Sequence, residues 1–118
     1  MSNEAERAAE LTQFREFLGD FAPALLGYTD KVLFGDVWKR PGLTPRERSL
    51  IVISALLAMY RPEELTAHIG IGLNQNGVTQ EELAELITML AFYAGWPNAM
   101  TASRIAKTFV DAKATKKG

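Results

Sequence analysis

The stretch from Leu43 to Leu73 limits the possible folds of this chain more than any other segment. Thr44, Pro45 and Glu47 form a helix-start signature: a capping hydroxyl, a proline at the first helical position and a carboxylate placed to return the capping bond. A helix is therefore predicted to begin at Pro45. From Leu50 to Ala58 almost every residue is apolar, on all sides of that helix. Such a helix is expected to be enclosed by other helices.

A second helix is predicted to follow the Arg61-Pro62 pair, where proline interrupts the first one. It carries His68, the only histidine of the chain. By the three-and-four spacing of helical neighbours, His68 shares one side with apolar and small residues, namely Leu65, Ile69, Gly72 and Leu73. His68 is therefore expected to point toward the core side, near the central helix.

The rest of the chain also shows helical patterns, and no alternating strand pattern is found. An N-terminal helix is predicted over Asn3–Leu18 with Gly19 at its end, and Pro23 opens a helical stretch through Phe34. The helix that carries His68 should stop at Asn76-Gly77, and Thr79 with Glu82 forms a second capping box. A sixth helix should start at Pro97 and lead to a frayed polar tail from Lys113. We expect an all-α fold of about six helices.

Length and composition indicate a single domain over residues 1–118, large enough for a core of its own. The longest apolar run, from Leu50 to Tyr60, is about half of what a membrane span needs. No secretory signal is visible at the N-terminus. The chain has no cysteine, which excludes disulfides, thiolate metal ligands and thiol peroxidase chemistry. We expect a cytoplasmic protein that does not insert into membranes.

Charge is unevenly distributed, although the net charge is only −1. Five cations against the single acid Glu47 stand between residues 39 and 61: Lys39, Arg40, Arg46, Arg48 and Arg61. From Pro62 to Ser103 there is no lysine or arginine. A second helix without cations cannot hold phosphates well, so nucleic-acid binding is not expected. The local cation cluster instead favours a small anionic ligand.

The helix after Thr79 is predicted to have an apolar surface that is broader than the other helices of one subunit can cover. Its main stripe is apolar: Leu83, Leu86, Ile87, Leu90, Ala91 and Ala94. Met89, Phe92 and Tyr93 widen that stripe toward the other side of the helix. The excess suggests contact with another subunit.

Three segments of the chain resemble the carboxymuconolactone decarboxylase family: FGDVWKRPGLTPRERSLIVISALL, RPEELTAHIGIGLNQNGVTQEELAEL and LAFYAGWPNAM. The resemblance is best over residues 34–109. The order and spacing of the three segments agree with the family throughout. It implies a small all-helical subunit of the alkylhydroperoxidase D-like kind that assembles into rings, commonly hexamers with trimers as an alternative, with active sites close to subunit contacts.

One branch of that family, the alkylhydroperoxidase D type, uses a Cys-x-x-Cys pair, a following histidine and an earlier glutamate. When the sequences are aligned on His68, these positions hold Arg61, Glu64 and Ser49. None of the three residues matches, so thiol-dependent hydroperoxide reduction is excluded. The remaining cysteine-free branch implies decarboxylation of 4-carboxymuconolactone to 3-oxoadipate enol-lactone, in aromatic degradation. The lactone accepts the electrons itself, so no metal or organic cofactor is implied.

Three side chains are candidates for the chemistry that this resemblance implies. His68 is the candidate proton donor, because histidine changes charge near neutral pH; the alternative is a core histidine hydrogen-bonded to Glu64. Arg48 and Arg61 are candidates for binding the carboxylates of the substrate, since guanidinium donors match carboxylate geometry. The alternative is that both arginines are solvated helix ends.

Further candidates have weaker support. Glu47 could orient His68 or Arg48, although capping already explains it. Glu64 could pair with His68 or form an ion pair. The aromatic rings near chain breaks, Trp38, Tyr93 and Trp96, could wall a pocket or belong to the core or an interface.

The sequence thus predicts a cofactor-free carboxy-lyase that acts on a small carboxylated lactone. Two alternatives stay open. The first is a proton-transfer enzyme, an isomerase or lactone-opening enzyme, on another acidic metabolite. The second is a ring-forming ligand-binding protein without turnover.

Overall fold

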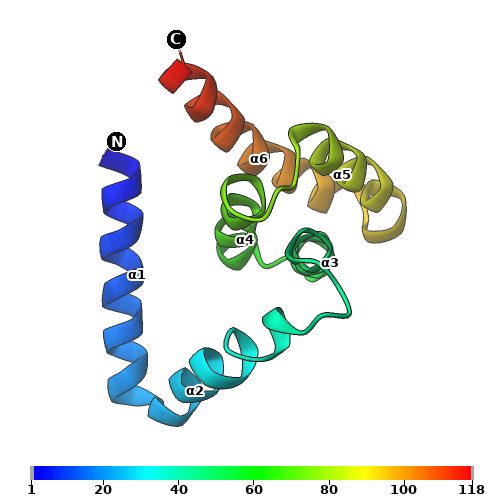
Figure 1. Cartoon of the computed structure of the whole chain (residues 1–118). Coiled ribbons are helices and arrows are strands. Elements are labelled where there is room, and N and C mark those ends of the chain that lie inside the picture. The colour runs from blue at the N-terminus through cyan, green and yellow to red at the C-terminus, as the bar shows by residue number, and fades with distance from the viewer. Residues whose placement is uncertain (1, 118) are drawn as a thin grey trace. The chain divides into compact units, whose positions relative to one another are not determined.

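The fold of this protein is all-α, as predicted. The computed structural model describes residues 2–117, and in this part of the chain it contains six α-helices and no strand (Figure 1). The chain divides into two compact units, with the boundary between Pro41 and Gly42. The single domain expected over residues 1–118 stays a prediction, and the two units are described separately.

The first unit begins with α1 (Ser2–Phe21) and α2 (Pro23–Tyr28). The predicted stop at Gly19 is wrong, because α1 continues through this glycine to Phe21. Glycine weakens a helix but ends it only where the chain also turns, and the turn here comes from Pro23. Proline disfavours helical backbone at the residue before it, and Ala22 accordingly leaves the helix with φ −138°.

The rest of the first unit is a π-helical segment, η1 (Thr29–Leu33), and a short 3-10 helix, η2 (Val37–Lys39). Arg15 of α1 holds Asp30 of η1 through two hydrogen bonds of 3.0 and 2.7 Å. The hydrogen bond from Arg15 lowers the pKa of Asp30. No residue of α2, η1 or η2 is buried. Large apolar side chains of this unit stay exposed, among them Phe14, Phe17, Phe21 and Leu25.

The second unit consists of α3 (Pro45–Ala58), α4 (Pro62–Asn74), α5 (Gln80–Ala94) and α6 (Trp96–Lys117). Both predicted capping boxes are confirmed, at Thr44 with Glu47 and at Thr79 with Glu82. Helices α3 and α4 pack on each other, α5 packs on α3, and α6 packs on α4 and α5 (Figure 1). The core lies between these four helices and consists of Ile53, Leu57, Leu65, Ile69, Val78, Leu83, Ile87, Ala91, Ala99, Ala102 and Ala106.

Helix α3 is central to this unit but is not enclosed. Its buried residues are Ser49, Ile53 and Leu57, which lie on one side, whereas Ile51 on another side is 54% exposed. The expectation of an enclosed helix is therefore wrong for the single chain. Three neighbouring helices cover only the side of α3 that faces them.

The ends of the later helices differ slightly from the sequence prediction. Helix α4 ends at Asn74, and Gly77 takes the left-handed backbone expected of it, with φ +80°. Helix α6 begins at Trp96 rather than Pro97 and continues to Lys117, so the frayed tail predicted from Lys113 is wrong.

The connection between α3 and α4 places Tyr60 in a left-handed conformation, with φ +55°. The N–H of Arg61 donates to the Leu56 carbonyl at 3.0 Å, and the N–H of Tyr60 donates to the Leu57 carbonyl at 3.2 Å. This pattern is a Schellman motif, in which glycine normally occupies the position that Tyr60 holds.

Replacing Tyr60 with glycine is expected to raise the free energy of unfolding by about 0.5–1 kcal/mol, because a side chain in this conformation costs more than the added backbone entropy of glycine. Urea denaturation followed by circular dichroism measures the change. Tyr60→Ala is the matched control, since it removes the ring and keeps the strained Cβ. An equal free energy of unfolding for Tyr60→Gly and Tyr60→Ala would contradict the backbone strain at residue 60.

Candidate functional site

His68 lies on the side of α4 that faces α3. Gly72, one turn later on the same side, packs so closely on α3 that a Cβ there would lie 3.2 Å from Ile53 Cδ1 and 3.6 Å from Ser49 Cβ. The ring of His68 is half-buried, and its Nδ1 atom is closed off from solvent. Burial lowers the pKa of His68 below the ordinary histidine value. The neutral ring is therefore favoured near pH 7.

The lowered pKa of His68 predicts a pH dependence of stability. The unfolded chain takes up this proton at about pH 6.5, before the folded chain does. As the pH falls through that value toward the lower folded pKa, the unfolded state binds more protons and stability declines. Denaturation at pH 7.5 and pH 5 should show a larger loss for the wild type than for His68→Gln. An equal loss would contradict the burial of a neutral ring.

Arg48 comes from the first turns of α3. Its side chain is half-buried, and its Nε atom is closed off from solvent like Nδ1 of His68. Both side chains take part in further interactions. Because Ser49 at the start of α3 contacts Gly72 near the end of α4, the two helices run antiparallel. His68 and Arg48 thus belong to one packed helical pair.

Arg61 is separated from Arg48 along this helical pair. It is exposed and lies in the connection after α3, whereas Arg48 lies about 15 Å away along the axis from Ala58, the last residue of α3. Along the axis of the helical pair, His68 in α4 lies between the positions of Arg48 and Arg61. The structure therefore does not bring the two predicted carboxylate-binding arginines to the same end of the pair.

The two acidic candidates differ in what they contact. The carboxylate of Glu47 accepts the Thr44 N–H at 2.8 Å, and this hydrogen bond lowers the pKa of Glu47. Its capping role thus accounts for its position. Glu64 is exposed in the first turn of α4, one turn before His68. For both acidic residues a role in the site stays a prediction.

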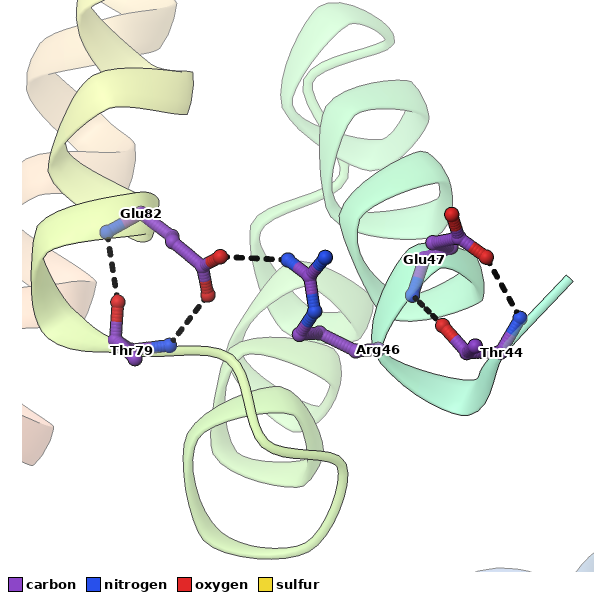
Figure 2. Close-up of polar contacts among 5 residues, drawn as sticks. All are labelled: Thr44, Arg46, Glu47, Thr79 and Glu82. Carbon is purple, nitrogen blue, oxygen red and sulfur yellow. Dashed lines mark hydrogen bonds and ion pairs between the residues drawn. The ribbon is translucent and has the colours of Figure 1, made fainter.

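An ion pair that the sequence did not indicate links the two capping boxes. Arg46 Nη1 donates to Glu82 Oε2 at 2.6 Å, and Figure 2 shows the guanidinium between the two boxes. The same carboxylate accepts the Thr79 N–H at 3.0 Å through its other oxygen. Glu82 therefore caps α5 and also holds the start of α3. Both capping boxes were recognisable, but their pairing depends on the tertiary fold.

A second link joins α3 to the connection between α4 and α5. Asn76 Nδ2 donates to Ser49 Oγ at 2.9 Å. Ser49 is 0% exposed and is the buried polar residue among those that the structure describes. A serine inside the apolar pattern of α3 was the only sequence signal for this contact.

Comparisons with known proteins identify the family of this chain. The sequence profile described as "Carboxymuconolactone decarboxylase family" matches residues 23–108, in both units. The chain belongs to the carboxymuconolactone decarboxylase family. It is 41% identical over 92 residues to a 4-carboxymuconolactone decarboxylase of Acinetobacter baylyi, covering 78% of this chain and 68% of that protein. It is 36% identical over 69 residues to the nitrosuccinic acid decarboxylase npaB of Metarhizium robertsii, covering 58% of this chain and 48% of that protein.

Two aromatic candidates of this carboxymuconolactone decarboxylase family member, Tyr93 and Trp96, lie at the α5–α6 junction, beside the end of α3 opposite to Arg48. Trp38 belongs to the first unit, where it stacks on Phe34 at 6.0 Å. Trp96 is 58% exposed and packs edge-on against Phe92, with 5.5 Å between the ring centroids. Asn98 Nδ2 donates to the carbonyl of Ala58 at 3.3 Å, which places the start of α6 beside the end of α3.

Two shallow grooves of about 530 and 400 Å³ flank the C-terminal half of α6. Val110 and Gln80 line both, and no predicted site residue lines either one. Among the side chains that the structure describes, no three acidic or histidine groups gather to hold a metal ion. No described helix is long and apolar enough to cross a membrane. The candidate site therefore remains the α3–α4 pair with His68 and Arg48.

Proposed function

We propose that this protein is a carboxy-lyase that removes CO₂ from a small substrate with more than one carboxylate, with 4-carboxymuconolactone as the leading candidate. The observation that carries this proposal is the placement of His68 and Arg48 on one antiparallel helical pair, each with a polar atom closed off from solvent. Both named relatives are decarboxylases, which supports the reaction class. With this substrate, the reaction belongs to the degradation of aromatic compounds. We also propose a cytoplasmic location, because a chain without cysteine suits a reducing compartment.

The proposed reaction uses the substrate as its own electron acceptor. The bond between the ring carbon and the departing carboxylate breaks, and its electron pair moves through the C=C bond to the lactone carbonyl oxygen. A proton then adds to the carbon next to that carbonyl. The protein must therefore hold a dianion, stabilise the developing oxyanion and deliver one proton.

Two side chains have roles in this reaction. Arg48 binds a substrate carboxylate through charge-assisted hydrogen bonds, which are stronger in a site closed to water. His68 delivers the proton. An anion bound next to a buried histidine raises the pKa of the ring, which favours proton uptake when the substrate binds. Arg61 and Glu64 are secondary candidates, because both are exposed.

A second candidate substrate class follows from the relative npaB. Nitrosuccinic acid is a dicarboxylic acid whose nitro group can accept an electron pair, as the lactone carbonyl does. A site with one arginine and one proton donor suits both compounds. We therefore propose that the site accepts dicarboxylates in which the departing carboxylate can pass its electron pair to a neighbouring acceptor group.

The test is turnover by the wild-type protein. 4-Carboxymuconolactone is generated enzymatically in the cuvette, and its loss is followed together with CO₂ release; nitrosuccinate is assayed in parallel. Loss of either compound with one equivalent of CO₂ supports the proposal. Lactone loss without CO₂ would favour lactone opening or isomerisation. Binding of both compounds without turnover would favour a ligand-binding protein.

We also propose that copies of this chain assemble into a ring, with a hexamer favoured over a trimer. Large apolar side chains stay exposed around the junction of α5 and α6, where Phe92 is 75% and Tyr93 82% exposed. Met59 and Tyr60, at the end of α3 beside this junction, are exposed as well. Monomeric proteins rarely expose large contiguous apolar patches. A second copy of the chain would cover these residues.

Tyr93→Glu is expected to reduce the assembly to smaller species, because a carboxylate in an apolar contact must lose its hydration. Size-exclusion chromatography with light scattering measures the mass, and six times the 13.0 kDa of one chain is expected for the wild type. Ala84→Glu is the matched control, since Ala84 is exposed on the polar side of α5. A wild type of 13.0 kDa at every concentration would contradict the ring.

A further inference from the structure

Two contacts fix the start of α3, and neither has a role in the proposed chemistry. The first is the hydrogen bond from Asn76 to the buried hydroxyl of Ser49, at 2.9 Å. The second is the ion pair of Arg46 with Glu82, at 2.6 Å. Arg46 and Ser49 are three residues apart, so both project from neighbouring positions on one side of the helix. Arg48 lies between them in sequence and projects from a different side.

The partners of both contacts lie in the connection after α4 and in the first turn of α5. The N–H of Val78 donates to the Gly72 carbonyl at 3.0 Å, and Gly77 supplies the left-handed turn that this bond requires. The side chain of Val78 is buried in the core. Asn76 and Glu82 are therefore attached to α4 and α5, and they hold the start of α3 from outside that helix.

We propose that Ser49 and Asn76 are positioning residues that set the direction of Arg48 toward the substrate carboxylate, an inference that rests on the proposed function. Ser49 cannot touch a substrate, because it is 0% exposed and covered by Gly72. Its hydrogen bond limits rotation of α3 about its axis. At about 6 Å from that axis, a rotation of about 10° shifts a side chain by about 1 Å. A shift of this size can cost about 100-fold in rate.

The contact explains why a polar residue occupies this buried position. An alanine would fit the same space beside Gly72 and would need no hydrogen-bond partner. The ion pair alone is half-exposed at both ends and gives a weaker constraint than a buried hydrogen bond. Ser49 thus adds a directional contact at the residue next to Arg48.

A double-mutant cycle tests this proposal. Ser49→Ala and Asn76→Ala are each expected to lower kcat/KM about tenfold. The double variant should be no worse than either single variant, because both remove the same hydrogen bond. In an Arg48→Gln background, Ser49→Ala should have no further effect. Ala84→Gly, on the exposed side of α5, is the control: it lowers the stability of the helix and leaves kcat/KM unchanged.

A second readout does not depend on turnover. The Nε–H of Arg48 is closed off from solvent, so its NMR signal should exchange slowly with water in the wild type and faster in Ser49→Ala and Asn76→Ala. Affinity for adipate, a stable dicarboxylate, should fall in the same two variants. If the wild type shows no turnover, the proposed reaction fails, while the exchange and adipate measurements still decide the positioning role.

The proposal is overturned if the two variants lose stability but keep kcat/KM, adipate affinity and slow Nε–H exchange. It is also overturned if Ser49→Ala lowers kcat/KM equally in the wild type and in the Arg48→Gln background, because Ser49 would then act independently of Arg48. Additive effects of Ser49→Ala and Asn76→Ala would likewise exclude a shared hydrogen bond as the cause.

Discussion

Replacing His68 with alanine is expected to lower kcat by about 10²–10⁴-fold, which is the usual contribution of a positioned proton donor. The substrate complex would still form, because Arg48 remains, but the carbanion left by CO₂ would lack a proton source. KM should therefore change much less than kcat. Initial rates of 4-carboxymuconolactone loss measure the effect, with circular dichroism to verify that α4 stays helical.

His68→Gln is the matched control, since glutamine keeps hydrogen-bonding capacity and about the same size but cannot donate a proton in this way. It should be as inactive as His68→Ala and more stable. A glutamine variant with most of the wild-type kcat would show that His68 orients the substrate and does not deliver the proton. Loss of helix content in both variants would instead support a core histidine.

Replacing Arg48 with glutamine is expected to lower kcat/KM by about 10–100-fold, because a hydrogen bond to a charged group contributes about 1.5–3 kcal/mol. The loss should come mainly as a higher KM, since the carboxylate that Arg48 holds is charged in both the ground state and the transition state. Arg48→Lys should recover part of the loss, because it keeps the charge but not the two parallel donors. Steady-state kinetics at constant ionic strength measure these changes.

Arg61→Gln provides the comparison on the same helical pair. Arg61 is exposed and lies about 15 Å along α3 from Arg48, so its removal should change kcat/KM less than removal of Arg48 does. If Arg61→Gln lowered kcat/KM more than Arg48→Gln, the carboxylate-binding site would instead lie at the α3–α4 connection. Equal large losses would indicate that one substrate spans both arginines.

Much of the secondary structure could be predicted, because the signals are local. Thr44 with Glu47 and Thr79 with Glu82 start helices through bonds within four residues, and both capping boxes are present. Proline at position 62 correctly separates α3 from α4. The stop at Gly19 failed because a glycine within a helix does not by itself turn the chain, whereas Pro23 does.

The sequence also identified the candidate side chains of the site, since the only histidine and the cation cluster are matters of composition. It could not show that burial lowers the pKa of His68, or that Arg48 and Arg61 lie at different ends of a helical pair. Both depend on how α3 and α4 pack. The hydrogen bond of Glu47 to Thr44 confirms the capping role that the sequence predicted, and a role of Glu47 beside His68 or Arg48 stays a prediction.

Sequence alone determined the all-α class, the helix starts after Thr44 and Thr79, and the family, because these depend on residue type and local spacing. Tertiary structure alone decided which distant residues meet. The contacts of Arg46 with Glu82 and of Ser49 with Asn76 join residues 36 and 27 positions apart. Such pairs follow from the packing of α3 on α4 and α5, which no single segment encodes.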